Sequence, residues 1–201
     1  GGVMKVDEVR KRPVLTLLDL CCGTGDMGIT LNRMARTPLQ LTSLDFCGPM
    51  LEQAKKRWED TAPRRLTQEF LRADAQATGL PAGHYDAITL LFSLRNMPSL
   101  PALFLETKRL LKPGGIFYAL ELSRPPSAWL RGPFYLYLNH LLPLMGGLLS
   151  GQAVAYRYLA ASIMRFPAPP EVVSLLRQAG LAKAEATSWS GGLVTLYQAE
   201  S

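Results

Sequence analysis

Small residues and carboxylates follow one another closely in a short stretch near the start of the sequence. The run Val14–Leu20 is aliphatic apart from one threonine and Asp19, and the small residues Cys21–Gly25 follow it. Asp26 then begins a segment with helical spacing. This order is typical of a strand, a tight loop and a helix, the first unit of a nucleotide-binding α/β sheet. Glycines let the backbone approach a ligand, and the helix offers it unpaired N–H groups.

The glycine spacing alone indicates a dinucleotide site. Gly23, Gly25 and Gly28 match the G-x-G-x-x-G pattern. Asp45 follows Gly25 by about the twenty residues expected of an acid that binds ribose hydroxyls. On this pattern the ligand would be NAD, and the chain would be a nicotinamide-dependent oxidoreductase.

The charges around the loop favour a different ligand. A pyrophosphate there would face the carboxylates of Asp19 and Asp26, and like charges in contact repel strongly. A ligand that carries an ammonium and a sulfonium would be attracted instead, and its ribose could still bind Asp45. S-adenosylmethionine (SAM) is such a ligand, so we expect SAM rather than NAD. A glycine-rich turn that binds no ligand is the remaining alternative.

Length and composition predict one α/β domain. The chain has 201 residues, of which 48% are hydrophobic, which is enough for a full core. Its net charge is +6, but the basic residues form short clusters without an RNA-binding motif, so we expect no nucleic-acid partner. Two of the three cysteines are adjacent and the two histidines lie far apart, which favours neither a disulfide framework nor a metal site. No signal peptide is recognisable, so we expect the cytoplasm.

The rest of the chain alternates between predicted strands and helices. Strands are expected at 39–45, 66–71, 85–92 and 116–122, and helices at 50–61, 99–111 and 170–179. A turn at 112–115 separates a helix from a strand, and a hairpin joins 182–188 to 193–199 through Ser190–Gly192. This order predicts a parallel, doubly wound sheet that ends in an antiparallel hairpin.

One stretch interrupts this alternation. Residues 132–156 contain no Asp, Glu, Lys or Arg, which by length alone fits a membrane span. Prolines, glycines and polar residues within it argue against a single span. We interpret residues 124–166 as an apolar helical insertion that forms a substrate lid or pocket within a single domain of residues 1–201. Plain core and a membrane span are the alternatives.

Several motifs resemble those of a known enzyme class. LDLCCGTGD (18–26), LDF (44–46), ADA (73–75) and LLKPGG (110–115) are similar to motifs of the class I SAM-dependent methyltransferases. SLRNM (93–97), ELSRP (121–125) and YRYLAASI (156–163) resemble, more narrowly, the ubiquinone/menaquinone biosynthesis C-methyltransferases. The resemblance implies a Rossmann-like, mostly parallel seven-stranded sheet with helices on both faces.

The resemblance also implies site residues. Asp19 would face the amino end of SAM. The expected cofactor-binding residues are Gly23, Thr24, Gly25, Asp45, Phe46, Asp74, Ala75 and Leu91. Arg95 and Asn96 are the candidate catalytic pair, because they follow the carboxyl end of the fourth strand, where ligands bind in such sheets. An Arg-Asn loop that merely caps the next helix is the alternative. Tyr156 and Arg157 are the candidate substrate-binding residues.

The implied reaction is methyl transfer from SAM to a ring carbon of a prenylated hydroquinone, either demethylmenaquinol or a ubiquinone precursor. A prenylated substrate implies peripheral contact with the inner face of a membrane, or a mitochondrial matrix location in a eukaryote. A homodimer or a quinone-biosynthesis complex is compatible with this interpretation. Family members usually carry an N-terminal segment that helps to close the active site, and the resemblance here starts at about Val14, so we expect catalysis to need such a segment. Another small-molecule substrate, or a non-catalytic SAM-binding subunit, are the alternatives.

Overall fold

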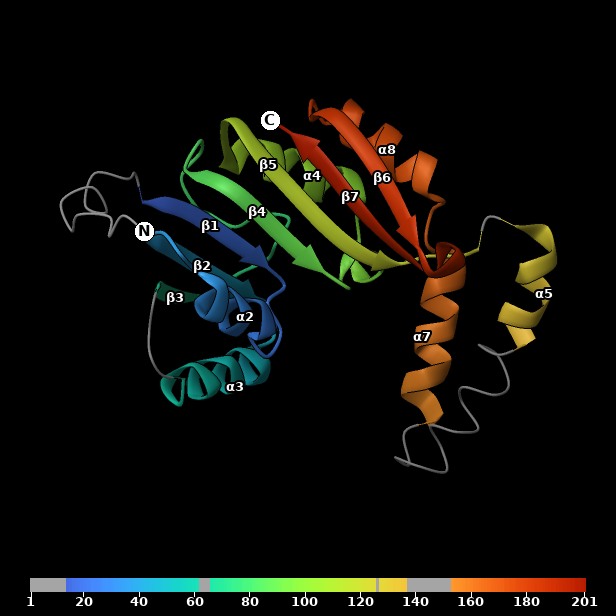
Figure 1. Ribbon diagram of the computed structural model, residues 1–201, viewed down its shortest axis with the longest axis horizontal. Helices are drawn as coiled ribbons and strands as arrows, with labels where there is room; N and C mark the ends of the chain where they lie inside the picture. The colour runs from blue at the N-terminus through green and yellow to red at the C-terminus, as the bar shows by residue number, and fades with distance from the viewer. Residues whose placement is uncertain (1–13, 62–65, 126, 137–152) are drawn as a thin grey trace, which may run out of the picture.

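The computed structural model describes residues 14–61, 66–125, 127–136 and 153–201, and it contains one seven-stranded sheet (Figure 1). The strands lie in the order β3-β2-β1-β4-β5-β7-β6. Their bounds are β1 Leu15–Leu20, β2 Leu39–Asp45, β3 Thr67–Arg72, β4 Tyr85–Leu91, β5 Leu111–Leu122, β6 Ala182–Trp189 and β7 Val194–Glu200. The first five strands pair in parallel, and β7 pairs antiparallel with both β5 and β6. The predicted fold class is therefore confirmed.

Helices connect the parallel strands and cover the sheet. The α-helices are α2 Asp26–Met34, α3 Gly48–Glu59, α4 Leu100–Leu110, α5 Ala128–Leu136, α7 Ala153–Arg165 and α8 Pro169–Gln178. Two short 3₁₀ turns, η1 Leu94–Asn96 and η3 Ser190–Gly192, complete the described elements. Ser99 caps α4, because its hydroxyl accepts a hydrogen bond from the amide of Ala102 at 3.3 Å.

Alternation along the strands explains why both faces of the sheet are covered. Leu18 and Leu20 are fully buried in the main core, which also contains Phe104 of α4 and Leu176 of α8. Leu17 points to the opposite face, where it packs in a cluster with Leu41, Trp58 and Leu66. A strand whose side chains are buried on both faces is apolar along most of its length, and β1 is so except at Thr16 and Asp19.

Two turns differ from expectation. The turn at 112–115 lies inside β5 rather than before it: Leu111 still pairs with Tyr85, but the next regular pair is Ile116 with Ala87. The four residues between them therefore loop out of register, and Gly114 adopts a positive φ of 76° there. Ser190–Gly192 forms a 3₁₀ turn rather than a simple two-strand hairpin turn.

Helices α5 and α7 project beyond the end of the sheet (Figure 1). They belong to the predicted insertion, and their exposed apolar side chains include Trp129, Leu136 and Val154. Residues 137–152 lie outside the described residues, so both the lid and the single-domain assignment stay predictions. No helix within the described ranges has the length and hydropathy that crossing a membrane would need.

Candidate active site

A cavity of about 600 Å³ opens where β1, β2 and β4 end at their carboxyl edge. Ligands of doubly wound sheets bind at this edge, next to the point where strand order reverses. Here β1 has β2 on one side and β4 on the other, so the chain crosses over the sheet at this position. The predicted residues Gly23, Thr24, Asp45, Phe46 and Leu91 line the cavity.

The loop after β1 has the open backbone that a bound ligand requires. Gly23 has a φ of +55°, and a Cβ added there would meet no atom within 4 Å. Gly25, at the start of α2, has a φ of +82°, and an added Cβ would lie 3.1 Å from the Cβ of Ala54. Gly28 serves packing instead, because a Cβ there would lie 2.7 Å from Gln68 Oε1. The dinucleotide-like spacing therefore combines an open loop with one close helix–sheet contact.

Asp45 connects the two loops that border the cavity. Its Oδ2 accepts a hydrogen bond from the amide of Gly23 at 2.7 Å, and its Oδ1 accepts one from the amide of Cys47 at 2.8 Å. An ionised carboxylate has about four lone-pair sites, so further acceptor capacity is left for a ligand's hydroxyl groups. The neighbouring Phe46 is 72% exposed at the rim and offers an apolar ring to a ligand.

Asp19 is a buried carboxyl group that faces the cavity. It is only 2% exposed, and its Oδ1 accepts a hydrogen bond from Thr89 Oγ1 at 2.7 Å. Burial, together with the negative charge of Asp45, raises the pKa of Asp19 to about 7, although the bond from Thr89 opposes the shift. A cation beside this group would stabilise its ionised form, so the position suits an ammonium.

The cavity is acidic although the chain as a whole is basic. Three carboxylates line it, those of Asp19, Asp26 and Asp45, and no lysine or arginine does so within the described part of the chain. Asp26 accepts a hydrogen bond from the guanidinium of Arg57 at 2.7 Å, and Arg57 also donates to the carbonyl of Thr24 at 2.7 Å. A pyrophosphate in the cavity would therefore face Asp19 and Asp45, whereas the charge of Asp26 is balanced by Arg57.

The loop after β4 forms the opposite wall of the cavity. Phe92, Ser93, Asn96 and Met97 line it, and Phe92 has a left-handed φ of 55°. Arg95 lies in the same turn, but its guanidinium turns toward β5, where it pairs with the buried carboxylate of Glu121. Of the two predicted catalytic residues, Asn96 therefore lines the first cavity and Arg95 does not.

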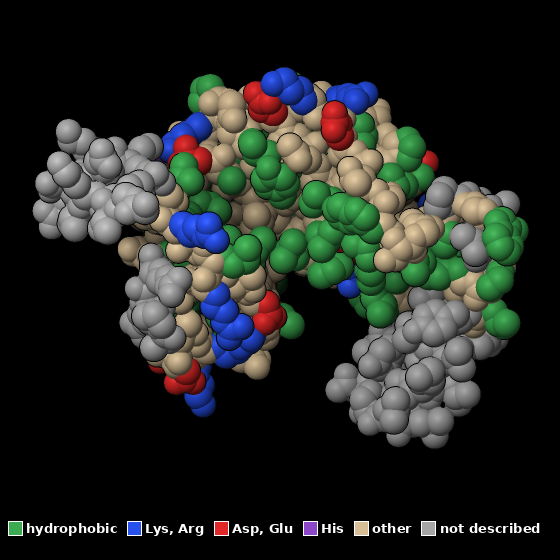
Figure 2. Space-filling model, viewed as in Figure 1, with side chains coloured by type: hydrophobic (Ala, Val, Ile, Leu, Met, Phe, Trp, Pro, Cys, Tyr) green, Lys and Arg blue, Asp and Glu red, His purple; other side chains and the backbone are tan. Residues whose placement is uncertain are grey.

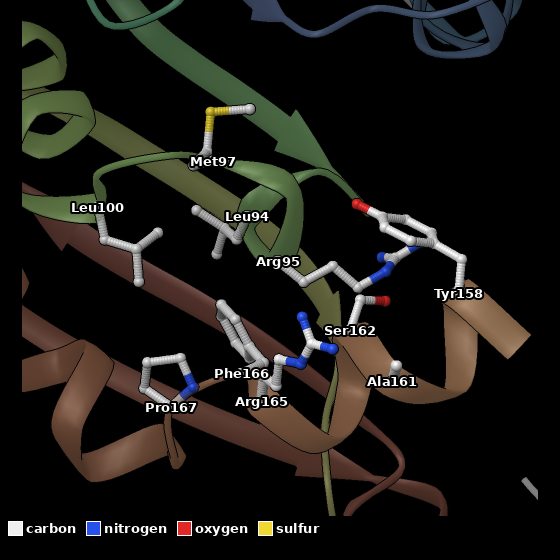
Figure 3. Close-up of a pocket in the computed structure, with 10 residues that line it drawn as sticks. All are labelled: Leu94, Arg95, Met97, Leu100, Tyr158, Ala161, Ser162, Arg165, Phe166 and Pro167. Carbon is white, nitrogen blue, oxygen red and sulfur yellow. The ribbon is translucent and has the colours of Figure 1, made fainter. Parts of the chain in front are cut away.

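A second cavity, of about 230 Å³, lies between η1 and α7 (Figure 3). Tyr158, Ser162 and Arg165 line it from α7 at helical spacing, and Arg95 and Met97 line it from the β4 loop. Met97 borders both cavities, which therefore lie on either side of the same loop. The hydroxyl of Tyr158 donates to Asn96 Oδ1 at 3.1 Å and ties α7 to the wall of the first cavity.

The remaining predicted residues do not line the first cavity. Gly25 shapes its loop. Burial is the main cause that raises the pKa of the Cys21 thiol, and Asp74 is one of the nearby carboxylates that add to this shift. Ala75 is buried in the main core. Arg157 is exposed on α7 and lines neither cavity, and the side chain of Tyr156 lies outside the described part. Their functional roles, like those of the other site residues, stay predictions.

Sequence reasoning did not single out several residues that border the cavities. Phe92 and Met97 flank the recognised LRN motif, Cys47 lies in the loop after Asp45, and Met50 lies in the first turn of α3. Position at a carboxyl strand end is the signal that could have identified them. Tyr158 was missed although it lies next to the predicted pair, because an apolar helix gives no indication of which side faces the site.

Comparisons with known proteins agree with this geometry. The model of the ubiE/COQ5 methyltransferase family matches residues 2–200. A demethylmenaquinone methyltransferase of Desulfitobacterium hafniense is 32% identical over 95% of this chain and 75% of its own length. A ubiquinone/menaquinone biosynthesis C-methyltransferase of Methylobacterium nodulans is 34% identical over 94% of this chain and 73% of its own.

A solved structure shares the fold. The crystal structure of a SAM-dependent methyltransferase from Aquifex aeolicus superposes with a TM-score of 0.65 at 16% identity, covering 97% of this chain and 86% of that one. The acidic cavity, the open glycine loop and the family match all indicate one cofactor, SAM. The chain therefore belongs to the ubiE/COQ5 methyltransferase family and is a SAM-dependent methyltransferase.

Proposed function

We propose that the protein methylates a ring carbon of a prenylated hydroquinone, either demethylmenaquinol or a ubiquinone precursor. The observation that carries this proposal is the match of nearly the whole chain to one family model. The names of the relatives cover both a naphthoquinone and a benzoquinone pathway, so the proposal is made at the level of the hydroquinone class.

The residues of the first cavity fit SAM chemically. Asp19 would hold the ammonium, and Asp45 would accept from the ribose hydroxyls. Phe46 would cover the adenine ring. When bound, SAM supplies a methyl group on a positively charged sulfur, which a carbon nucleophile can accept.

At the reaction centre the protein must bind the reduced hydroquinone, orient its ring and exclude water. Ionisation of a ring hydroxyl raises the electron density on the adjacent carbon. Asn96 would orient that hydroxyl; its position at the cavity wall and the hydrogen bond from Tyr158 to its Oδ1 support this role. The apolar side chains of Phe92 and Met97 would exclude water from the ring.

Contact with an anionic membrane surface is part of the proposal. Residues 122–170 contain four arginines and no aspartate or glutamate. Hydrophobic side chains gather on the face shown in Figure 2, and the exposed ones on α5 and α7 include Trp129, Leu136, Val154 and Tyr158. Positive charge beside exposed apolar side chains suits anionic headgroups and the membrane interface. Cosedimentation with vesicles that contain anionic lipid, but not with neutral ones, is the expected result.

The test of the proposed function is transfer of labelled methyl from SAM to chemically reduced, short-chain substrates. We expect the full chain, with any N-terminal segment of the natural protein, to methylate a demethylmenaquinol or a demethylated benzoquinol and to leave the oxidised quinones unchanged. Asp45→Ala should abolish both SAM binding and transfer. Binding of SAM without transfer to either quinol would support a non-catalytic subunit or a different substrate and would overturn the proposal.

A further inference from the structure

A buried carboxylate lies in the sheet directly behind the proposed reaction centre. Glu121 occupies an inward-facing position of β5, in register with Phe117 and Ala119, and its side chain is fully buried. A charged group at such a position is costly unless it is paired and hydrogen-bonded, so its presence needs a reason.

The hydrogen-bond donors to Glu121 are two backbone amides and the guanidinium of Arg95. Glu121 Oε1 accepts from Arg95 Nη1 and, at 2.8 Å, from the amide of Leu122. Its Oε2 accepts from the backbone amide of Arg95 at 3.1 Å. Within the described ranges no other side chain hydrogen-bonds to it, and the nearby hydroxyl of Tyr197 is buried without a partner. The carboxylate therefore holds both the backbone and the side chain of Arg95.

Arg95 extends this hold to the loop that borders the SAM cavity. Its Nη1 also donates to the carbonyl of Phe92 at 2.8 Å, across the residue with the left-handed backbone. The turn closes with the amide of Asn96 bonded to the carbonyl of Ser93 at 3.0 Å. Phe92, Ser93 and Asn96 all line the SAM cavity, whereas Arg95 lines the second cavity, where its side chain reaches toward Tyr158 (Figure 3).

We infer that Glu121 is a positioning residue for methyl transfer: it clamps Arg95, and the clamped loop presents Asn96 to the substrate. The inference deepens the proposed function and rests on it. Arg95 then acts through its contacts in the loop, because its guanidinium is already neutralised by Glu121. A group fixed in this way can hold a reacting ring to within the small tolerance that group transfer requires.

The decisive variant is Glu121→Gln, which keeps the size and the acceptor oxygen but removes the charge. The guanidinium of Arg95 is then no longer neutralised by a carboxylate, and one of the two acceptor oxygens that hold Arg95 is lost. If Arg95 acted on the substrate directly, its release would leave kcat unchanged or raise it. If Glu121 positions the loop, kcat should fall about 100-fold while the calorimetric Kd for SAM changes less than twofold.

A matched control separates positioning from loss of stability. Glu106 of α4 is another mostly buried carboxylate that pairs with an arginine, Arg109, and it lines neither cavity. Glu106→Gln should lower the melting temperature and leave kcat unchanged at a temperature well below melting. Wild-type kcat in Glu121→Gln at that temperature would overturn the inference.

Amide hydrogen exchange gives a readout that needs no turnover. In Glu121→Gln the amides of Asn96 and Met97, which bond to the carbonyls of Ser93 and Leu94, should exchange faster, while the amide of Ile29 in α2 should not. Absence of methyl transfer by the wild type would reject the proposed substrate class but not the clamp. Unchanged exchange at Asn96 and Met97 would reject the clamp whatever the substrate.

Discussion

Replacement of Asp19 by asparagine should stabilise the ligand-free protein and weaken SAM binding at the same time. Asparagine has the shape of a protonated aspartate, and its Oδ1 can still accept the hydrogen bond from Thr89. The change therefore removes little except the negative charge. Because that charge is buried at the cavity, the two effects should differ in sign and in pH dependence.

The stability effect follows from the pKa. Burial raises the pKa of Asp19 from 3.8 to about 7, so the folded state holds this proton more tightly than the unfolded state. The stability of the wild type should therefore fall as the pH rises from about 4 to about 7. A shift of about 3 units, at 1.36 kcal/mol per unit, gives at most about 4 kcal/mol by pH 8, and Asp19→Asn should regain it.

SAM binding should show the opposite trend in the same pH range. The ammonium of the ligand selects the ionised carboxylate, so the affinity of the wild type should rise about tenfold per pH unit between pH 5 and pH 7. Above about pH 8 the amino group of the ligand loses its own proton. Asp19→Asn should bind weakly, with little dependence on pH below that point.

Urea unfolding and calorimetric SAM titration at pH 5, 6, 7 and 8 would test both effects. Asp26→Asn is the matched control: Asp26 lines the same cavity, but its carboxylate is exposed and its bond to Arg57 lowers its pKa. The stability of Asp26→Asn relative to the wild type should not increase as the pH rises. We expect the difference in unfolding free energy between Asp19→Asn and the wild type to be larger at pH 8 than at pH 5. If it is not, the reasoning about the buried charge is wrong.

Two further predictions concern other ion pairs. Arg57→Ala should raise the Kd for SAM about fivefold, because it removes the bond that holds the carbonyl of Thr24 in the glycine loop, whereas Lys55→Ala on the same helix should not. The bond from Arg109, together with those from a nearby threonine, lowers the pKa of Glu106 to about 2, so its stabilisation is present above pH 4.5 and is lost as the pH falls toward 2. Glu106→Gln should cost about 1–2 kcal/mol at pH 7, after a discount for the exposure of Arg109, and urea unfolding at pH 7 and pH 3 should show that this difference shrinks.

Local patterns in the sequence were sufficient for the order of the strands and helices. β1 and β4 are largely apolar runs, and the helices after them have regular spacing, so each element is recognisable without its neighbours. The looped-out residues between Leu111 and Ile116 were misplaced for the opposite reason. Proline and two glycines indicate a turn, but only pairing with Tyr85 and Ala87 shows that the strand begins before it.

Five of the eight predicted cofactor-binding residues line the first cavity, because they follow the carboxyl ends of strands that the sequence marks, and their binding role stays a prediction. The substrate side was not predictable in this way, because it depends on contacts between distant residues. Arg95 reads as a free catalytic cation until Glu121, 26 positions later, is seen to pair with it. Likewise the partner of Asp26 is Arg57, 31 positions away, and the contact of Tyr158 with Asn96 spans 62.

The double hydrogen bond of Asp45 bears on how fast the cofactor can associate. Its carboxylate holds the amides of Gly23 and Cys47 before any ligand arrives, so the conformational entropy of ordering these two loops is lost during folding rather than during binding. Association on this side of the cavity then resembles docking to a rigid surface and should be limited mainly by diffusion and orientation. Replacement of Asp45 would shift that entropic cost into the binding step, and the association rate constant should fall together with the affinity.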